Sequence, residues 1–180
     1  MDTSLRLLDT YFTTATILNW YPLLENDVFK DIIIESLSFA VKSNRANIFA
    51  FIVMSNHFHV VWQILPPFEL NKVRQNLLKF TAQQFKFLLI NNTLNKEDIY
   101  ITETKTSDIL DIFRVDKTDR KHQFWKRNPL SVEILSEKVL RQKINYIHNN
   151  LSRKNLNDVS YKYSSAYYYE TGVKNWDFLL

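Results

Sequence analysis

The sequence of 180 residues contains no cysteine, four prolines and a single glycine, Gly172. Without cysteine the chain can form neither a disulfide framework nor a thiolate metal site, which is consistent with a reducing cytoplasm. No Pro/Gly-rich linker and no internal repeat divides the chain. With 46% apolar residues it has enough material for one core, so we expect a single domain over residues 1–180.

Long apolar runs are also missing. The longest ones fall far short of the ~20 residues that a membrane helix requires. The N-terminus, "MDTSLRLLDT", lacks the basic and then apolar order of a secretory signal peptide. These absences predict a cytoplasmic protein without a membrane partner.

Charge of one sign is concentrated in one segment. The net charge is only +4, yet residues 114–154 contain 11 Lys/Arg against 4 Asp/Glu. Aromatic residues lie within this basic segment, namely Phe124, Trp125 and Tyr146. Such a combination suits a polyanion such as nucleic acid, although a well-solvated surface explains the charge alone equally well.

The hydrophobic pattern predicts alternating strands and helices. Strands are expected at residues 10–20, 46–54 and 57–65, helices at 25–43, 70–90 and 131–151, and one or two short strands within 98–115. This order predicts an α+β protein with a ferredoxin-like split βαβ core, in which helices cover one face of an antiparallel sheet. A C-terminal helix carrying a tyrosine and an aromatic tail, residues 155–180, would pack on this core.

Two histidines interrupt an apolar stretch that reads "VMSNHFHVVWQ". Side chains alternate along a strand, so His57 and His59 share one face while Phe58 points to the other. Two imidazoles on one face can bind a metal ion if a third ligand arrives from elsewhere. Taken alone, the pattern is more often a pair of half-buried, hydrogen-bonded histidines.

The last predicted helix contains "NYIHNNL". Tyr146 and Asn150 are four residues apart and project from one face, whereas His148 points to roughly the opposite side. Two imidazoles and one amide oxygen would offer three ligands to a divalent cation. The tyrosine hydroxyl could then attack a phosphodiester that the metal polarises and form a covalent phosphotyrosine.

Three stretches resemble one protein family. "VMSNHFHVVWQ" resembles the histidine–hydrophobe–histidine (HUH) strand of the single-tyrosine, IS200-like transposases. "KINYIHNNLSRKNL", followed by "YKYSSAYYY", and "FWKRNPLSVEILSE" resemble motifs of the REP-associated tyrosine transposase branch. The resemblance spans about residues 11–169, with the motifs in the same order. It departs at Leu151, which is usually proline, and at residues 128–131, where many relatives carry a histidine.

The resemblance implies specific roles. His57, His59 and Asn150 would bind Mg²⁺ or Mn²⁺, and Tyr146 would be the nucleophile. The implied reaction is cleavage and rejoining of single-stranded DNA near a hairpin through a 5′-phosphotyrosine, in a nucleoid-associated protein of the bacterial cytoplasm. Relatives act as monomers or as homodimers, and both remain open for this chain.

Single strands are held by basic grooves and stacked aromatic rings. The candidate DNA-binding residues are Arg120, Lys121, Lys126, Arg127, Arg153 and Lys154, with Trp125 or Tyr163 as stacking platforms. Each has a plainer interpretation, because Trp125 beside Phe124 could pack in the core and the lysines could simply be solvated.

Other functions fit less well. A domesticated hairpin-DNA-binding protein that is catalytically silent would keep the fold, but it would not need both histidines and Tyr146. Replication initiators and relaxases also pair histidines at a metal, usually in longer chains with a third histidine. An RNA-binding ferredoxin-like module would show a "K/R-G-F-x-F" strand, which a chain with one glycine lacks.

Overall fold

The computed structural model describes residues 7–91, 106–150 and 160–180. The strands are β1 Thr10–Thr16, β2 Ala46–Val53, β3 His57–Ile64 and β4 Leu130–Glu133. The helices are α1 Asp27–Lys42, α2 Leu70–Asn91, α3 Thr106–Ile112, α4 Glu137–Asn149 and α5 Ala166–Thr171, with short 3₁₀ turns at Leu18–Trp20 and Leu23–Glu25. None of the described helices is long and apolar enough to span a membrane.

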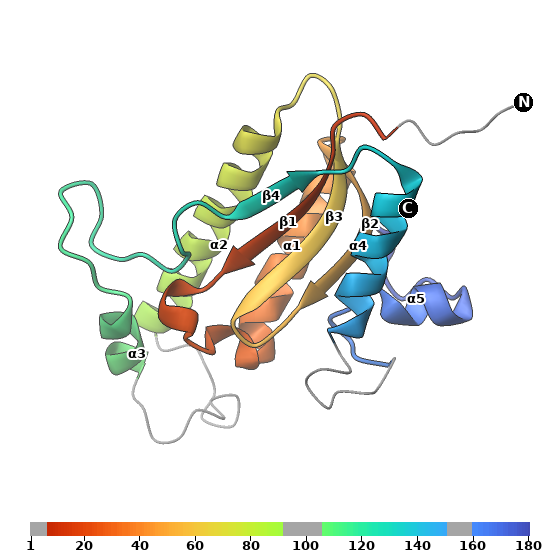
Figure 1. The fold of residues 1–180 in the computed structure, drawn as a ribbon. Coiled ribbons are helices and arrows are strands. Elements are labelled where there is room, and N and C mark those ends of the chain that lie inside the picture. Colours follow the sequence, from red (N-terminus) through yellow and green to blue (C-terminus); the bar gives the residue numbers. More distant parts are fainter. Residues whose placement is uncertain (1–6, 92–105, 151–159) are drawn as a thin grey trace, which may run out of the picture.

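The strands form one antiparallel sheet in the order β2-β3-β1-β4. The predicted α+β class is confirmed, and β2 and β3 pair as an antiparallel hairpin. Helices α1 and α2 lie behind the sheet, whereas α4 crosses its front (Figure 1). The sheet is therefore covered on both faces, and the face under α4 is the one that concerns function.

The side chains of strand β3 pack alternately against the two faces of the sheet. Phe58, Val60 and Trp62 pack into the large core under α1 and α2. Val61, on the other face, joins a smaller core with Ile144 of α4. Because both faces are covered, the strand is apolar at nearly every position. The exceptions are Gln63 near the end of the strand and the two histidines, and the alternation places both histidines on the α4 side.

Side-chain caps fix where two helices begin. The Asn26 side chain accepts a hydrogen bond from the Val28 amide (2.9 Å) at the start of α1. The Ser136 side chain accepts a hydrogen bond from the Val139 amide (3.4 Å) at the start of α4. Ser131, where the last helix was expected to begin, lies in β4. The predicted helix start at residue 131 is therefore wrong, because this segment pairs with β1.

Two other predicted elements differ in the structure. The first strand ends at Thr16 and not at residue 20, because the chain turns sharply through residues 17–20. Within 98–115, where short strands were expected, residues 98–105 lie outside the described part of the chain. Thr106–Ile112 forms helix α3.

The described part of the C-terminal segment, residues 160–180, lies against β2. Tyr163, Phe178 and Leu179 are buried in the large core. The Leu180 amide donates a hydrogen bond to the Ile48 carbonyl (3.0 Å). These contacts cover the outer edge of β2, whose backbone N–H and C=O groups would otherwise be unpaired at the edge of the sheet.

Candidate functional site

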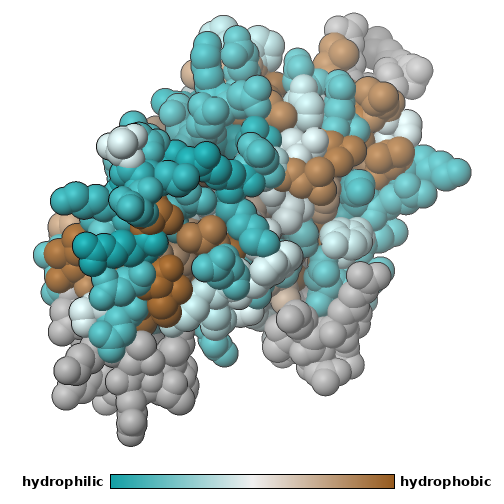
Figure 2. All heavy atoms as spheres, turned by 60° about the vertical axis from the view of Figure 1, so that its left-hand side comes forward, coloured by the Kyte–Doolittle hydropathy of each residue, from teal (hydrophilic) through white to brown (hydrophobic). Residues whose placement is uncertain are grey.

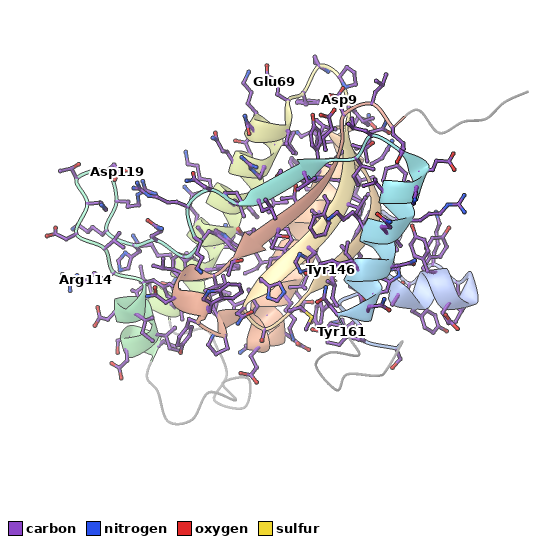
Figure 3. All side chains as sticks on the ribbon, viewed as in Figure 1. Asp9, Glu69, Arg114, Asp119, Tyr146 and Tyr161 are labelled. Carbon is purple, nitrogen blue, oxygen red and sulfur yellow. The ribbon has the colours of Figure 1, made fainter. Side chains whose placement is uncertain are left out.

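The two histidines and the tyrosine come together on the front of the sheet. The ring centroids of His57 and His59 are 4.8 Å apart. The Tyr146 ring, from α4, lies 5.4 Å from the His59 ring and 5.7 Å from the Phe12 ring of β1. In Figure 3, Tyr146 lies on the side of α4 that faces the sheet. The structure thus unites side chains almost 90 positions apart in the sequence.

Asn56 holds His57 in one tautomer. The His57 Nδ1 atom is 2.7 Å from the Asn56 side-chain oxygen, which can only accept a hydrogen bond. The orientation of the Asn56 amide is fixed, because its nitrogen donates to the Trp20 carbonyl (3.1 Å). Nδ1 of His57 therefore carries the proton, and the lone pair lies on Nε2, as in a metal-ligating histidine.

His59 is buried and neutral. Only 4% of its surface is exposed, and its Nδ1 lies 2.7 Å from the Thr14 hydroxyl on the neighbouring strand. Burial is the main reason why the pKa of His59 is lowered to about 3, and repulsion from Lys143, and from His57 whenever that ring is protonated, contributes to the same shift. The ring therefore keeps a lone pair for a metal at neutral pH.

Asn150 caps the C-terminus of α4, one turn beyond Tyr146. Its amide nitrogen donates to the Tyr146 carbonyl (3.0 Å), so the helix engages the nitrogen of this side chain and not its oxygen. Among the described residues no three His, Cys, Asp or Glu side chains cluster as a metal site. Two imidazole nitrogens and an amide oxygen fit a divalent cation that keeps water or phosphate oxygens as its other ligands.

Lys143, one turn before Tyr146, brings positive charge to the same place. Its ammonium lies 4.7 Å from the centre of the Phe12 ring, and this ring in turn packs against Tyr146 and His59. Lys143 is not among the site residues predicted from the sequence. Its spacing of three residues from Tyr146 would have indicated that both side chains lie on the same face of the helix.

His148 points away from the site, as predicted. Its Nε2 lies 2.9 Å from the Ser165 hydroxyl, and its ring packs against Tyr169 at 4.9 Å. Burial lowers the pKa of His148 to about 4. This histidine joins α4 to the C-terminal segment and leaves the other face of α4 to Tyr146.

A basic groove of about 670 Å³ lies between α2 and residues 119–129. Its lining contains seven basic side chains and a single acidic one, Asp119. Four of the basic residues were predicted from the sequence, namely Arg120, Lys121, Lys126 and Arg127. The three others come from α2 and are Arg74, Lys79 and Lys86. Figure 2 shows hydrophilic residues over much of this side of the molecule.

The two predicted stacking platforms are packing residues in this structure. Trp125 is 7% exposed, packs against Phe58 and donates its ring N–H to the Thr81 hydroxyl (3.0 Å). Tyr163 is 2% exposed, and its hydroxyl donates to Asp31 (2.9 Å). Tyr163 has no open face, and Trp125 is buried although it belongs to the groove lining, so the structure does not support a stacking role for either ring. Of the other DNA-binding candidates, Arg153 and Lys154 lie outside the described residues.

Comparison with known proteins identifies the fold. No protein-family model matches the sequence, and no curated protein does so either. A solved structure, described as "Structure of the REP associates tyrosine transposase bound to a REP hairpin", matches with a TM-score of 0.60 at 15% identity. The match covers 96% of this chain and 86% of that chain. The chain has the fold of a REP-associated tyrosine transposase.

The transposase fold confirms the structural side of the resemblance seen in the sequence motifs. An identity of 15% establishes the fold alone. The roles of His57, His59, Tyr146 and Asn150 therefore stay predictions that rest on the geometry described above.

Proposed function

We propose that this protein is a metal-dependent single-stranded DNA endonuclease and strand transferase, which cleaves near DNA hairpins through a 5′-phosphotyrosine intermediate. The observation that carries this proposal is the meeting of Tyr146 with His57 and His59 on one face of the sheet. The fold adds support, since the matched transposase is bound to a REP hairpin. The partner would be single-stranded or hairpin DNA, bound by a monomer or a homodimer.

Tyr146 supplies the nucleophile. Its phenolic oxygen attacks the phosphorus, the bond from phosphorus to the 3′-oxygen breaks, and the 5′-phosphate stays on the tyrosine. The phenolic proton passes to solvent, which the 38% exposure of Tyr146 allows, and the leaving 3′-oxygen takes a proton from solvent. Rejoining reverses these steps with a 3′-hydroxyl as the attacking group. The phosphotyrosine conserves the energy of the broken bond.

The other residues position the reacting groups. Nε2 of His57, Nε2 of His59 and the side-chain oxygen of Asn150 would hold Mg²⁺ or Mn²⁺. The bound metal would polarise the phosphodiester and stabilise charge in the transition state. Asn56 and Thr14 fix the two imidazole rings through their Nδ1 atoms.

The basic groove offers a path for the DNA backbone. Phosphate contacts from Lys and Arg displace condensed cations, so each contact adds to the salt dependence of binding. We expect Lys79→Ala combined with Arg127→Ala to weaken hairpin binding and to lower the slope of log affinity against log salt by about 1.4–1.8. Fluorescence anisotropy at several salt concentrations measures both changes.

A matched control for the groove is Lys42→Ala combined with Lys174→Ala, which removes two exposed lysines outside the groove lining. This variant should retain the wild-type salt slope. If the groove variant and the wild-type protein show the same slope of log affinity against log salt, the DNA does not bind in this groove.

The proposed function is tested by incubating the protein with labelled single-stranded hairpin DNA and Mn²⁺. Denaturing gels should show a labelled product of low mobility that protease converts to a faster one. Chelation of the metal should remove this product. Tight binding without a covalent product, across several hairpins and metals, would instead establish the catalytically silent hairpin-binding protein.

A further inference from the structure

Trp20 is an exposed tryptophan beside the histidine pair. Its side chain is 55% exposed, and its ring meets the His57 ring edge-on at 6.2 Å. The other tryptophans behave differently, because Trp62 and Trp125 are buried and Trp176 is half-buried. The Trp20 ring therefore offers an accessible flat surface directly beside the histidine pair.

The backbone around Trp20 is strained. Asn19 and Trp20 have φ values of 56° and 58°, in the left-handed region that residues other than glycine seldom adopt. Such strain persists only where the surroundings hold it, and it gathers at ligand sites. Here the Trp20 amide donates to the Ile17 carbonyl (3.0 Å), and its carbonyl accepts from Asn56 (3.1 Å). The same asparagine orients His57, so the tryptophan and the histidine are fixed as one unit.

Trp20 also connects the histidine pair to the basic groove. The ammonium of Lys126, a residue of the groove lining, lies 4.2 Å from the centre of the Trp20 ring. Surfaces that bind single strands combine a cation for the phosphate with a flat ring for the base. Both parts are present at one point, next to the proposed metal ligands.

We propose that Trp20 is a positioning residue that stacks on one base of the single strand beside the scissile phosphate, with Lys126 contacting the neighbouring backbone. The location of the scissile phosphate rests on the proposed function. The stacking itself is a binding property, so it can be measured without metal and without cleavage.

The experiment combines protein variants with DNA that lacks single bases. Binding is measured without metal in a Tyr146→Phe background, using a hairpin with a single-stranded flank and an abasic site at each flank position in turn. Since a stacked base contributes ~1–3 kcal/mol, one abasic position should weaken binding about 5- to 150-fold. Trp20→Leu should weaken binding of the intact DNA by a similar factor, and the same abasic site should then cost nothing more.

Two further variants separate stacking from a structural role. Trp20→Phe keeps a flat ring and should retain most of the sensitivity to the abasic site, whereas Phe39→Leu, an exposed aromatic change on α1, should behave as wild type. If Trp20→Leu does not fold, the Trp20→Phe protein should lose the fluorescence quenching that bound DNA causes in the Trp20 protein. The same abasic profile with and without the Trp20 ring would overturn the proposal. If the binding profile across the abasic sites depends on Trp20 but the wild-type protein forms no covalent product, the stacking role of Trp20 is supported and the proposed nuclease function is rejected.

Discussion

Tyr146→Phe is expected to abolish the covalent protein–DNA product while hairpin affinity stays within about twofold of the wild-type value. The phenyl ring keeps the contacts with Phe12 and His59 but lacks the attacking oxygen. Removing the nucleophile of a covalent mechanism should lower the rate at least ~1000-fold. A time course of labelled hairpin DNA on denaturing gels measures the product, and anisotropy measures the affinity.

The control for this prediction removes a hydroxyl outside the site. Tyr168→Phe, on α5, should form the product at the wild-type rate, because α5 packs on the other side of α4 through His148 and Tyr169. Equal thermal midpoints for both variants would show that folding is not the cause. Continued product formation by Tyr146→Phe would mean that another residue is the nucleophile.

The features of the site that could be predicted from the sequence are those with short-range causes. His57 and His59 share a face because strand side chains repeat every second residue, and Tyr146 and His148 diverge because of helical geometry. Their partners depend on distant chain segments. Thr14 meets His59 only because β1 and β3 pair in one register, and several registers preserve the same alternation of apolar residues.

The surfaces were predicted less well than the core elements. Lys79 and Lys86 read as the solvated face of a helix, and they become part of a groove only when residues 119–129 fold over α2. The exposure of Trp20 likewise depends on a turn that the pattern of β1 does not mark. Trp125 differs in the opposite direction, since a tryptophan among basic residues suggested stacking whereas its ring is buried in the core.

The second large effect is expected for the histidine pair. His57→Ala should lower the rate of formation of the metal-dependent product at least ~100-fold. Even the loss of a residue that only orients a metal ligand lowers metal affinity or activity about 10- to 100-fold. It should also weaken Mn²⁺ binding to the protein alone, which calorimetry measures without DNA. His57 is only half-buried, so its removal should leave the fold intact.

Comparison of all four histidines makes this prediction specific. His59→Ala should lose Mn²⁺ binding as well, but with a lower thermal midpoint, because it empties a buried position and removes the partner of Thr14. His148→Gln, on the opposite side of α4, should keep both Mn²⁺ binding and product formation. His122→Gln, in the basic groove, should retain Mn²⁺ binding. Unchanged Mn²⁺ binding in His57→Ala and His59→Ala would show that the paired histidines are structural, and the metal ligands would then have to be sought elsewhere in the chain.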